Sequence, residues 1–410
     1  MRDTRGHNMA YYQLIGADAH MAEHPAAWAR AQKEYPDRAP RVVKDPPGLG
    51  KGLWIFFDEN ISPARSAYYC LGLVVADKPK GATHGGTEAE AQAYKDYIQN
   101  YNETFTYEDF PGGWETSAYL AAMDRDGIEA TFLFSSPTRY NYSQKDAKFQ
   151  RSVFNSYNEW LLEFAAPAPK RLFPVPLISV LDVENAVKDI YSYAKRGIKT
   201  VQIPTRILGS GYYEPIYEPI WAAAQDANIV LNIHHNSDQN ANRRKGEGKT
   251  TLTGPRDEDP RKDLIKTTNF APALECISNL IFSGVFDRYP KLRLAVSEFK
   301  IHWIAGLVQT IDYSEQRGST YDPDRNAYKR RPSEYFHDNI FFTFENDRAG
   351  ILSTPLFGEN NFMFASDYPH HVSTWPHSHK ILADNCAGLP PAVMRKLGRD
   401  NANRVFNMGL

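Results

Sequence analysis

The stretch NFMFASDYPHH, residues 361–371, combines the two features that decide how this chain folds and where its chemistry lies. A short apolar run ends abruptly in Asp367, and His370 and His371 follow almost at once. A run this short and apolar predicts a strand that is buried on both of its faces. Three side chains that can bind metals or protons therefore stand where a buried strand ends.

Seven other segments share this length and apolar character. With 361–368, the predicted strands are 12–20, 128–136, 172–179, 198–205, 228–235, 291–298 and 339–346. Helical patterns separate them, as in VENAVKDIYSYAKRG (183–197), where the final glycine predicts the end of the helix. Eight strands alternating with helices predict an α/β protein of the (β/α)8 TIM barrel type. A doubly wound open sheet is the alternative, but no GxGxxG motif follows the first strand.

Two intervals are too long to be simple connections. The first strand ends near His20 and the second begins near Ile128, and the aromatic-rich part 41–122 predicts an inserted lid or subdomain. The polar segment 237–270 is a second predicted insertion. We expect residues 1–410 to form a single barrel domain, with both insertions at the rim where the strands end and where such enzymes have their active sites.

The composition excludes several classes of partner. The chain has 410 residues, is 42% hydrophobic and carries a net charge of -2, so it can bury a large core and has no bulk charge to attract nucleic acid or membranes. Its three cysteines are far apart, which is typical of a reducing cytoplasm. We find no signal peptide and no membrane-spanning segment, and so expect a cytoplasmic protein. Aromatic residues around 94–107 suggest an oligomer, with like or unlike subunits.

Carboxylates and imidazoles collect at the ends of four predicted strands. Strand 1 ends in Asp18-Ala19-His20, where residues two apart share a face, and strand 5 ends in His234. Strand 6 ends in Glu298, and a helical turn after it would place His302 on the same face. Each side chain alone could be a structural histidine or a capping aspartate. Several buried carboxylates together are costly unless a cation neutralises them, so the pattern predicts a metal site.

The predicted metal ligands are Asp18, His20, His234, Glu298, His302 and Asp367. His235, His370 and His371 are weaker candidates, and His371 is the best placed of these three to face a substrate. The set contains carboxylate oxygens and imidazole nitrogens but no thiolate. Such donors favour Fe or Mn, with Zn as the remaining option, and six donors are enough for one or two divalent ions.

The same segments resemble the amidohydrolase superfamily, in particular its amidohydrolase-2 branch, which includes the ACMSD-like decarboxylases. The similar stretches are GADAHMAEHPAAW (16–28), LIFSGVFDRYPKLRLAVSEFKIHWI (280–304), PSEYFHDNIFFTFEND (332–347) and FASDYPHHVSTWPHS (364–378). The resemblance implies a distorted TIM barrel whose metals are held from strands 1, 5, 6 and 8. It assigns Asp18, His20, His234 and Asp367 to those positions.

The chain departs from the usual pattern of that superfamily at four positions. Asp18 replaces the first histidine of a His-x-His motif, Glu298 replaces the strand-6 histidine, and His302 stands where glycine is common. Strand 4 carries Gln202, so we do not expect the carboxylated lysine that bridges two metals in some members. A bridged pair of metals would instead use Glu298 or Asp367.

Four functions remain open from the sequence. The first is a metal-dependent hydrolase that cleaves a C–N, C–O or thioester bond of a small organic substrate, with Asp367 as base and His302 or His371 steadying the oxyanion. The second, implied by the resemblance, is a non-oxidative decarboxylase of an aromatic or related acid. Arg139 could anchor such an acid, although we interpret it as an arginine of a surface turn. The others are an Fe or Mn dinuclear oxygenase and a non-catalytic scaffold subunit.

Overall fold

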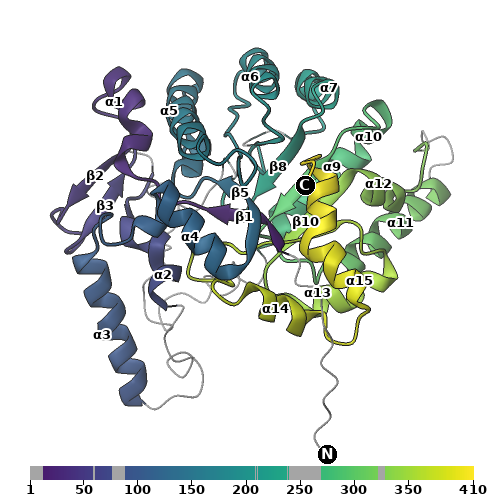
Figure 1. Cartoon of the computed structure of the whole chain (residues 1–410). Coiled ribbons are helices and arrows are strands. Elements are labelled where there is room, and N and C mark those ends of the chain that lie inside the picture. Colours follow the sequence, from purple (N-terminus) through teal and green to yellow (C-terminus); the bar gives the residue numbers. More distant parts are fainter. Residues whose placement is uncertain are drawn as a thin grey trace, which may run out of the picture.

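Eight parallel strands form a barrel in the computed structural model, which describes residues 13–58, 61–75, 88–207, 209, 211–237, 239, 269–321 and 328–410 (Figure 1). The strands are β1 (Leu14–His20), β5 (Ile128–Phe134), β6 (Leu172–Pro174), β7 (Thr200–Gln202), β8 (Val230–His234), β9 (Leu294–Ser297), β10 (Ile340–Phe344) and β11 (Phe362–Phe364). Each lies inside a segment predicted to be a strand. The TIM barrel prediction is therefore confirmed.

The barrel is distorted because its strands belong to two separate sheets, β1-β5-β6 and β7-β8-β9-β10-β11. At one seam, the backbone N–H of Ile178 donates to the carbonyl of Gln202 at 2.9 Å. At the other seam, the N–H of Asp367 donates to the Asp18 carbonyl at 3.1 Å, and the N–H of His20 donates to the Tyr368 carbonyl at 2.6 Å. The second seam thus joins the ends of β1 and β11 through three of the predicted ligands.

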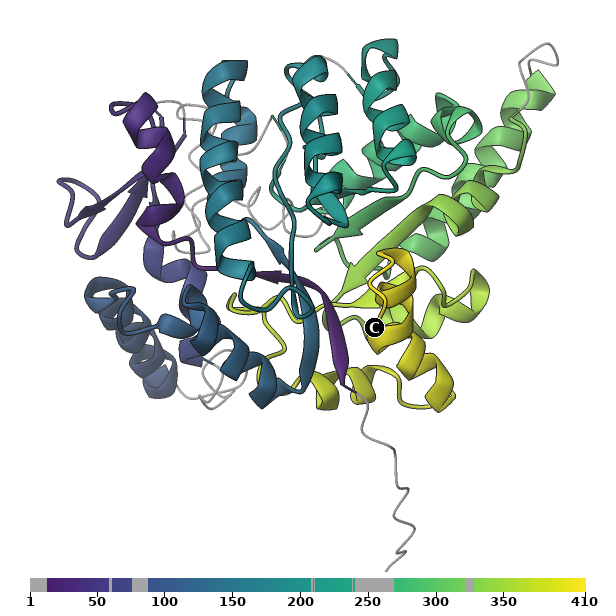
Figure 2. The same ribbon diagram turned by 45° about the horizontal axis from the view of Figure 1, so that its top comes forward.

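Helices cover the outside of the barrel, as Figure 2 shows. The α-helices are α1 (Ala29–Glu34), α2 (Leu71–Val75), α3 (Glu88–Thr104), α4 (Thr116–Asp126), α5 (Ala147–Ala165), α6 (Val183–Lys195), α7 (Glu218–Asp226), α9 (Ala271–Phe282), α10 (Val285–Arg288), α11 (Ile304–Tyr321), α12 (Pro332–Asn339), α13 (Arg348–Ser353), α14 (Ser378–Asn385), α15 (Pro391–Arg395) and α16 (Asn401–Val405). Asp182 caps the start of α6 by accepting from the Asn185 N–H, and Gly197 with φ 81° follows its end. The helix predicted at 183–197 is confirmed. None of the helices in these ranges is long and apolar enough to cross a lipid bilayer.

The interval between β1 and β5 forms a small antiparallel sheet and the long helix α3, which lie at one side of the barrel (Figure 1). The strands of this sheet are β2 (Arg41–Lys44), β3 (Leu53–Phe56) and β4 (Ala64–Arg65). Aromatic rings of the interval pack on one another, with the Tyr101 and Phe110 centroids 5.2 Å apart. The N–H of Gly72 in α2 donates to the Pro369 carbonyl at 2.9 Å, so the interval also contacts the loop after β11. Most of the second predicted insertion, 237–270, lies outside the described residues.

Candidate metal centre

The structure brings five of the six predicted ligands together at the barrel rim where the strands end. The Nε2 atom of His20 lies 3.6 Å from Asp18 Oδ1 and 3.4 Å from Asp367 Oδ1. The Nε2 atom of His234 lies 3.4 Å from Asp18 Oδ2 and 3.5 Å from Glu298 Oε2. These five side chains, Asp18, His20, His234, Glu298 and Asp367, are called the ligand cluster below.

The polar atoms of the ligand cluster face one another without hydrogen bonds. Both carboxylate oxygens of Asp18 and Asp367, and the Nε2 atoms of His20 and His234, are buried and lack a hydrogen-bond partner in the structure. Oε2 of Glu298 is likewise buried and without a hydrogen-bond partner. Buried polar atoms are rarely left unsatisfied in this number, and a cation would satisfy all of them at once. Oxygen and imidazole donors fit a divalent Mn, Fe or Zn ion.

Burial and crowding displace the pKa values of the cluster. Burial, and then repulsion by Asp367, raise the pKa of Glu298 to about 8. Burial also holds the pKa of Asp18 and of Asp367 well above the ordinary range, and it lowers the pKa of His234 to about 3. Neutral imidazole is the form that binds metals. A cation among the carboxylates would favour their charged forms and so offset the cost of burying them.

Hydrogen bonding orients the His234 ring for such a role. Its Nδ1 lies 2.9 Å from the carbonyl oxygen of His235. An N–H at Nδ1 donating to that carbonyl leaves the lone pair of Nε2 directed at Asp18 and Glu298. The neighbour His235 therefore contributes its backbone to the site.

The sixth predicted ligand, His302, lies apart from the cluster. The condition for a shared face is not met, because α11 begins only at Ile304, and Glu298 and Lys300 have positive φ angles of 64° and 59°. The His302 side chain is 49% exposed, and its Nδ1 lies 3.2 Å from Asp347 Oδ2. That carboxylate also accepts the backbone N–H of His302 at 3.0 Å, so Asp347 holds both groups away from the barrel mouth.

The two histidines after Asp367 lie in different surroundings. His371, predicted to face the substrate, is exposed, and its ring lies 5.2 Å from the ring of Tyr68 in the 3-10 helix η2 (Ser66–Cys70). His370, the weaker candidate, is buried, and its ring stacks on that of His20 at 4.0 Å. Its Nδ1 lies 3.1 Å from Asp367 Oδ1. The signal for His370 was its position three residues after Asp367, inside the turn that the two residues form.

Arg139 is the second side chain whose position differs from the sequence interpretation. It lies in the 3-10 helix η5 (Thr138–Ser143) and is only 3% exposed, so the reading as a surface turn arginine is wrong. Its guanidinium donates to the Ser135 carbonyl and lies 3.4 Å from His20 Nδ1, while its Nε has no hydrogen-bond partner. In the described part of the chain, no acidic side chain forms an ion pair with it. Folding of the segment after β5 over the rim buries this cation beside the ligand cluster.

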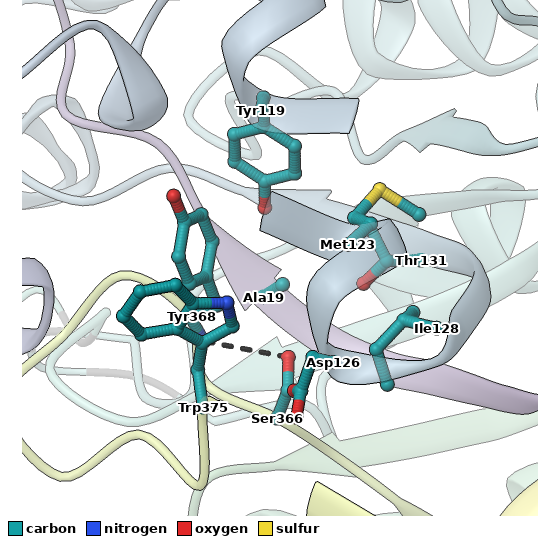
Figure 3. Close-up of a pocket in the computed structure, with 9 residues that line it drawn as sticks. All are labelled: Ala19, Tyr119, Met123, Asp126, Ile128, Thr131, Ser366, Tyr368 and Trp375. Carbon is teal, nitrogen blue, oxygen red and sulfur yellow. Dashed lines mark hydrogen bonds between the residues drawn. The ribbon is translucent and has the colours of Figure 1, made fainter. Parts of the chain in front are cut away.

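A small pocket lies behind the cluster, between the strands and α4 (Figure 3). Among the residues that line it, Ala19, Ser366 and Tyr368 alternate along the chain with the ligands of β1 and of the segment after β11. Alternating residues point to opposite sides of a strand, so the pocket is on the outer face of the barrel wall. Tyr119, drawn in Figure 3, donates its hydroxyl to the His20 carbonyl at 2.9 Å. The pocket therefore supports the backbone of the ligands and is not the barrel mouth.

Comparison with known proteins agrees with this geometry. A family model described as Amidohydrolase matches residues 72–408. The chain belongs to the amidohydrolase family. The resemblance seen in the sequence is therefore confirmed, and the chain is an enzyme of that family. The structure of an amidohydrolase from Mycobacterium avium subsp. paratuberculosis matches with a TM-score of 0.72 and 18% identity, covering 96% of this chain and 99% of the other.

Two decarboxylases also share the amidohydrolase fold seen here. The 5-carboxyvanillate decarboxylase of Sphingomonas paucimobilis matches with a TM-score of 0.60 and 19% identity, covering 97% of this chain and 99% of the other. A dihydroxybenzoic acid decarboxylase of Polaromonas sp., with bound manganese and the inhibitor 2-nitroresorcinol, has a TM-score of 0.57 and 17% identity, covering 79% and 95%. Likeness at this level of identity establishes the shared fold.

Proposed function

We propose that this enzyme is a divalent-metal-dependent decarboxylase that removes the carboxylate of an aromatic acid without oxidation. The observation that carries the proposal is the buried guanidinium of Arg139 beside the ligand cluster. With Asp367 protonated as the acid of the reaction, one divalent cation neutralises the charges of Asp18 and Glu298, so the cluster no longer offsets the charge of Arg139. An anionic ligand then stabilises it, and a carboxylate matches the fork of a guanidinium.

The solved relatives support decarboxylation over the hydrolysis that we expected first. The two decarboxylases act, by their names, on aromatic carboxylic acids, and one of them was solved with manganese. Hydrolysis of a neutral amide or ester would leave the charge of Arg139 without a partner in the substrate. A carboxylic acid substrate accounts for both the cluster and the arginine.

We assign a single Mn²⁺ to the ligand cluster, held by Asp18, His20, His234, Glu298 and Asp367. When bound, the cation supplies positive charge that orients and polarises oxygen atoms of the substrate. A second ion would need His370 as a ligand. His370 forms a group of metal-ligating side chains only with His20 and Asp367 among the described residues, and both of these are already assigned to the single ion.

The residues of the chain supply the remaining steps. Arg139 binds the substrate carboxylate and fixes the ring above the cluster. The bond from the ring to the carboxylate breaks, CO2 leaves, and the ring carbon takes up one proton. Asp367 is placed to deliver this proton because its carboxyl group lies between the imidazoles of His20 and His370, at 3.4 and 3.1 Å. Because the Ser136 hydroxyl donates to the Met21 carbonyl, its oxygen accepts the Nε2–H of His370, and the bare Nδ1 of His370 then faces the proton that Asp367 holds.

The test is release of CO2 by the Mn²⁺-loaded enzyme from 2,6-dihydroxybenzoate and 5-carboxyvanillate. We expect Mn²⁺-dependent release, and we expect Arg139→Gln to raise KM by about 10- to 100-fold with the bound Mn²⁺ unchanged. Arg30→Gln is the matched control, because Arg30 is half exposed and pairs with Glu163 on the surface. Hydrolysis of amides or esters without any CO2 release from aromatic acids would overturn the proposal in favour of the hydrolase.

A further inference from the structure

The segment 135–139 positions two groups of the site. It follows β5 and ends in Arg139, whose own N–H donates to Ser135 Oγ at 3.0 Å. Its second serine, Ser136, places Oγ 3.0 Å from His370 Nε2. A shift of this short segment would therefore move both the guanidinium of Arg139 and the Ser136 hydroxyl that contacts His370.

A single carboxylate holds the segment from inside. Glu23 lies beyond the end of β1, is 1% exposed and does not belong to the ligand cluster. Its Oε1 accepts from Ser135 Oγ at 2.7 Å and from the Ser136 N–H at 2.8 Å. Its Oε2 accepts from the Thr138 N–H at 3.1 Å and from the Thr138 hydroxyl. The segment thus wraps around both oxygens of the carboxylate.

The same donors are tied to neighbouring elements, so the arrangement is rigid. Thr138 Oγ1 accepts from Trp28 Nε1 at 2.7 Å, and Ser136 Oγ donates to the Met21 carbonyl at 3.0 Å. A buried carboxylate costs more than an apolar side chain of similar volume would in the same space. The Glu23 carboxylate fixes the orientation of the segment 135–139, because four donors of that segment converge on its two oxygen atoms.

We propose that Glu23 is a positioning residue for substrate binding: its carboxylate fixes the segment 135–139 so that Arg139 and His370 stand at the places the reaction requires. The inference rests on the proposed role of Arg139 as the anchor of the substrate carboxylate. Glu23 itself touches neither the metal nor the substrate.

The experiment is a double-mutant cycle on the Mn²⁺-loaded enzyme, assayed above the pKa of about 7 that burial gives Glu23, so that its side chain is a charged carboxylate. Glu23→Gln keeps one acceptor oxygen but turns an amide N–H2 towards the Thr138 N–H, so it breaks one of the two arms. We expect KM for 2,6-dihydroxybenzoate to rise roughly tenfold, with the Mn²⁺ content unchanged. In the Arg139→Gln background the same change should alter KM less than about twofold, because no anchor is left to misplace.

Asp126→Asn is the matched control for this cycle. Asp126 is also a buried carboxylate, and it accepts the N–H of Ser378 at 2.9 Å and that residue's hydroxyl at 2.5 Å, but it lies behind the barrel wall (Figure 3). The Asp126→Asn substitution should lower the thermal midpoint and leave KM unchanged, both in the wild type and in the Arg139→Gln background. If Glu23→Gln fails to fold, Thr138→Val removes a single hydroxyl of the same arm, and we expect about a threefold rise in KM.

The outcomes separate this inference from the proposed function. A Glu23→Gln effect that multiplies fully with Arg139→Gln, or an unchanged KM, overturns the positioning role. If the wild-type enzyme accepts no aromatic acid, the proposed function fails, and crystal structures of the Mn²⁺-loaded wild type and Glu23→Gln then test Glu23 alone. We expect the Arg139 guanidinium to leave His20 while Asp18 and His234 stay in place. An unmoved segment 135–139 overturns the inference in that case too.

Discussion

Two kinds of buried carboxylate stand close to the end of β1. Asp18 and Asp367 in the ligand cluster have no hydrogen-bond partner for any of their oxygens, whereas both oxygens of Glu23 are surrounded by donors of the segment 135–139. All three are at most 1% exposed, and burial raises the pKa of each. Burial and a shifted pKa therefore do not distinguish a ligand from a structural acid. Carboxylate oxygens that lack a hydrogen-bond donor distinguish a candidate ligand from a structural acid.

The largest expected effect is the loss of activity and of Mn²⁺ when a carboxylate of the ligand cluster is removed. Asp18→Asn removes the carboxylate whose two oxygens face His20 and His234, and we expect turnover of the aromatic acid to fall on the order of 10³-fold or more with loss of Mn²⁺. Elemental analysis after dialysis measures the metal, and CO2 release measures turnover. Glu23→Gln is the internal comparison, since it should retain Mn²⁺. Equal Mn²⁺ content in the two variants would remove the distinction between them.

Removal of the cation should lower stability more than most substitutions do. Without it the unpartnered oxygens of the cluster repel one another, and with Mn²⁺ at 100 times its Kd the folded state gains about 2.7 kcal/mol. Thermal unfolding with and without a chelator measures the gain as a shift in Tm. Asp18→Asn should abolish most of that shift. A wild-type Tm that does not change when Mn²⁺ is removed would contradict the metal site.

The pH dependence of stability sharpens the comparison from the side of Glu23. Burial raises its pKa from 4.5 to about 7, so the folded enzyme keeps a proton that the unfolded chain loses between these values. The free energy of unfolding should therefore fall as the pH rises through this interval, by up to about 1.4 kcal/mol per pH unit, and level off above pH 7. Glu23→Gln should flatten this part of the profile in chemical unfolding with Mn²⁺ present. Identical slopes of stability against pH in the wild type and in Glu23→Gln would contradict the assignment of this titration to Glu23.

The smallest effect is expected at His302. Its side chain is half exposed and contacts Asp347 outside the cluster. We expect His302→Ala to cost less than about 1 kcal/mol in unfolding free energy and to leave both Mn²⁺ content and KM unchanged. Loss of Mn²⁺ from this variant would return His302 to the set of ligands.

The sequence was sufficient for the barrel and for most of the cluster because both follow from local patterns. Strands of a parallel barrel are apolar throughout, and their ends meet at one rim, so polar residues at those ends converge. His302 could not be placed this way, because left-handed backbone at Glu298 and Lys300 and a competing carboxylate 45 positions further on turn it aside. The burial of Arg139 and the donors of Glu23 likewise depend on contacts between segments more than 100 positions apart.

The close approach of Gly72 to the loop after β11 links the insertion to the chemistry. A Cβ atom at this position would lie 2.2 Å from the carbonyl oxygen of His370, so even alanine would force the two backbones apart. The insertion and the histidine loop therefore behave as a single interlocked part. Any segment that replaces the interval 41–122 would therefore need a residue without a side chain at the position of Gly72.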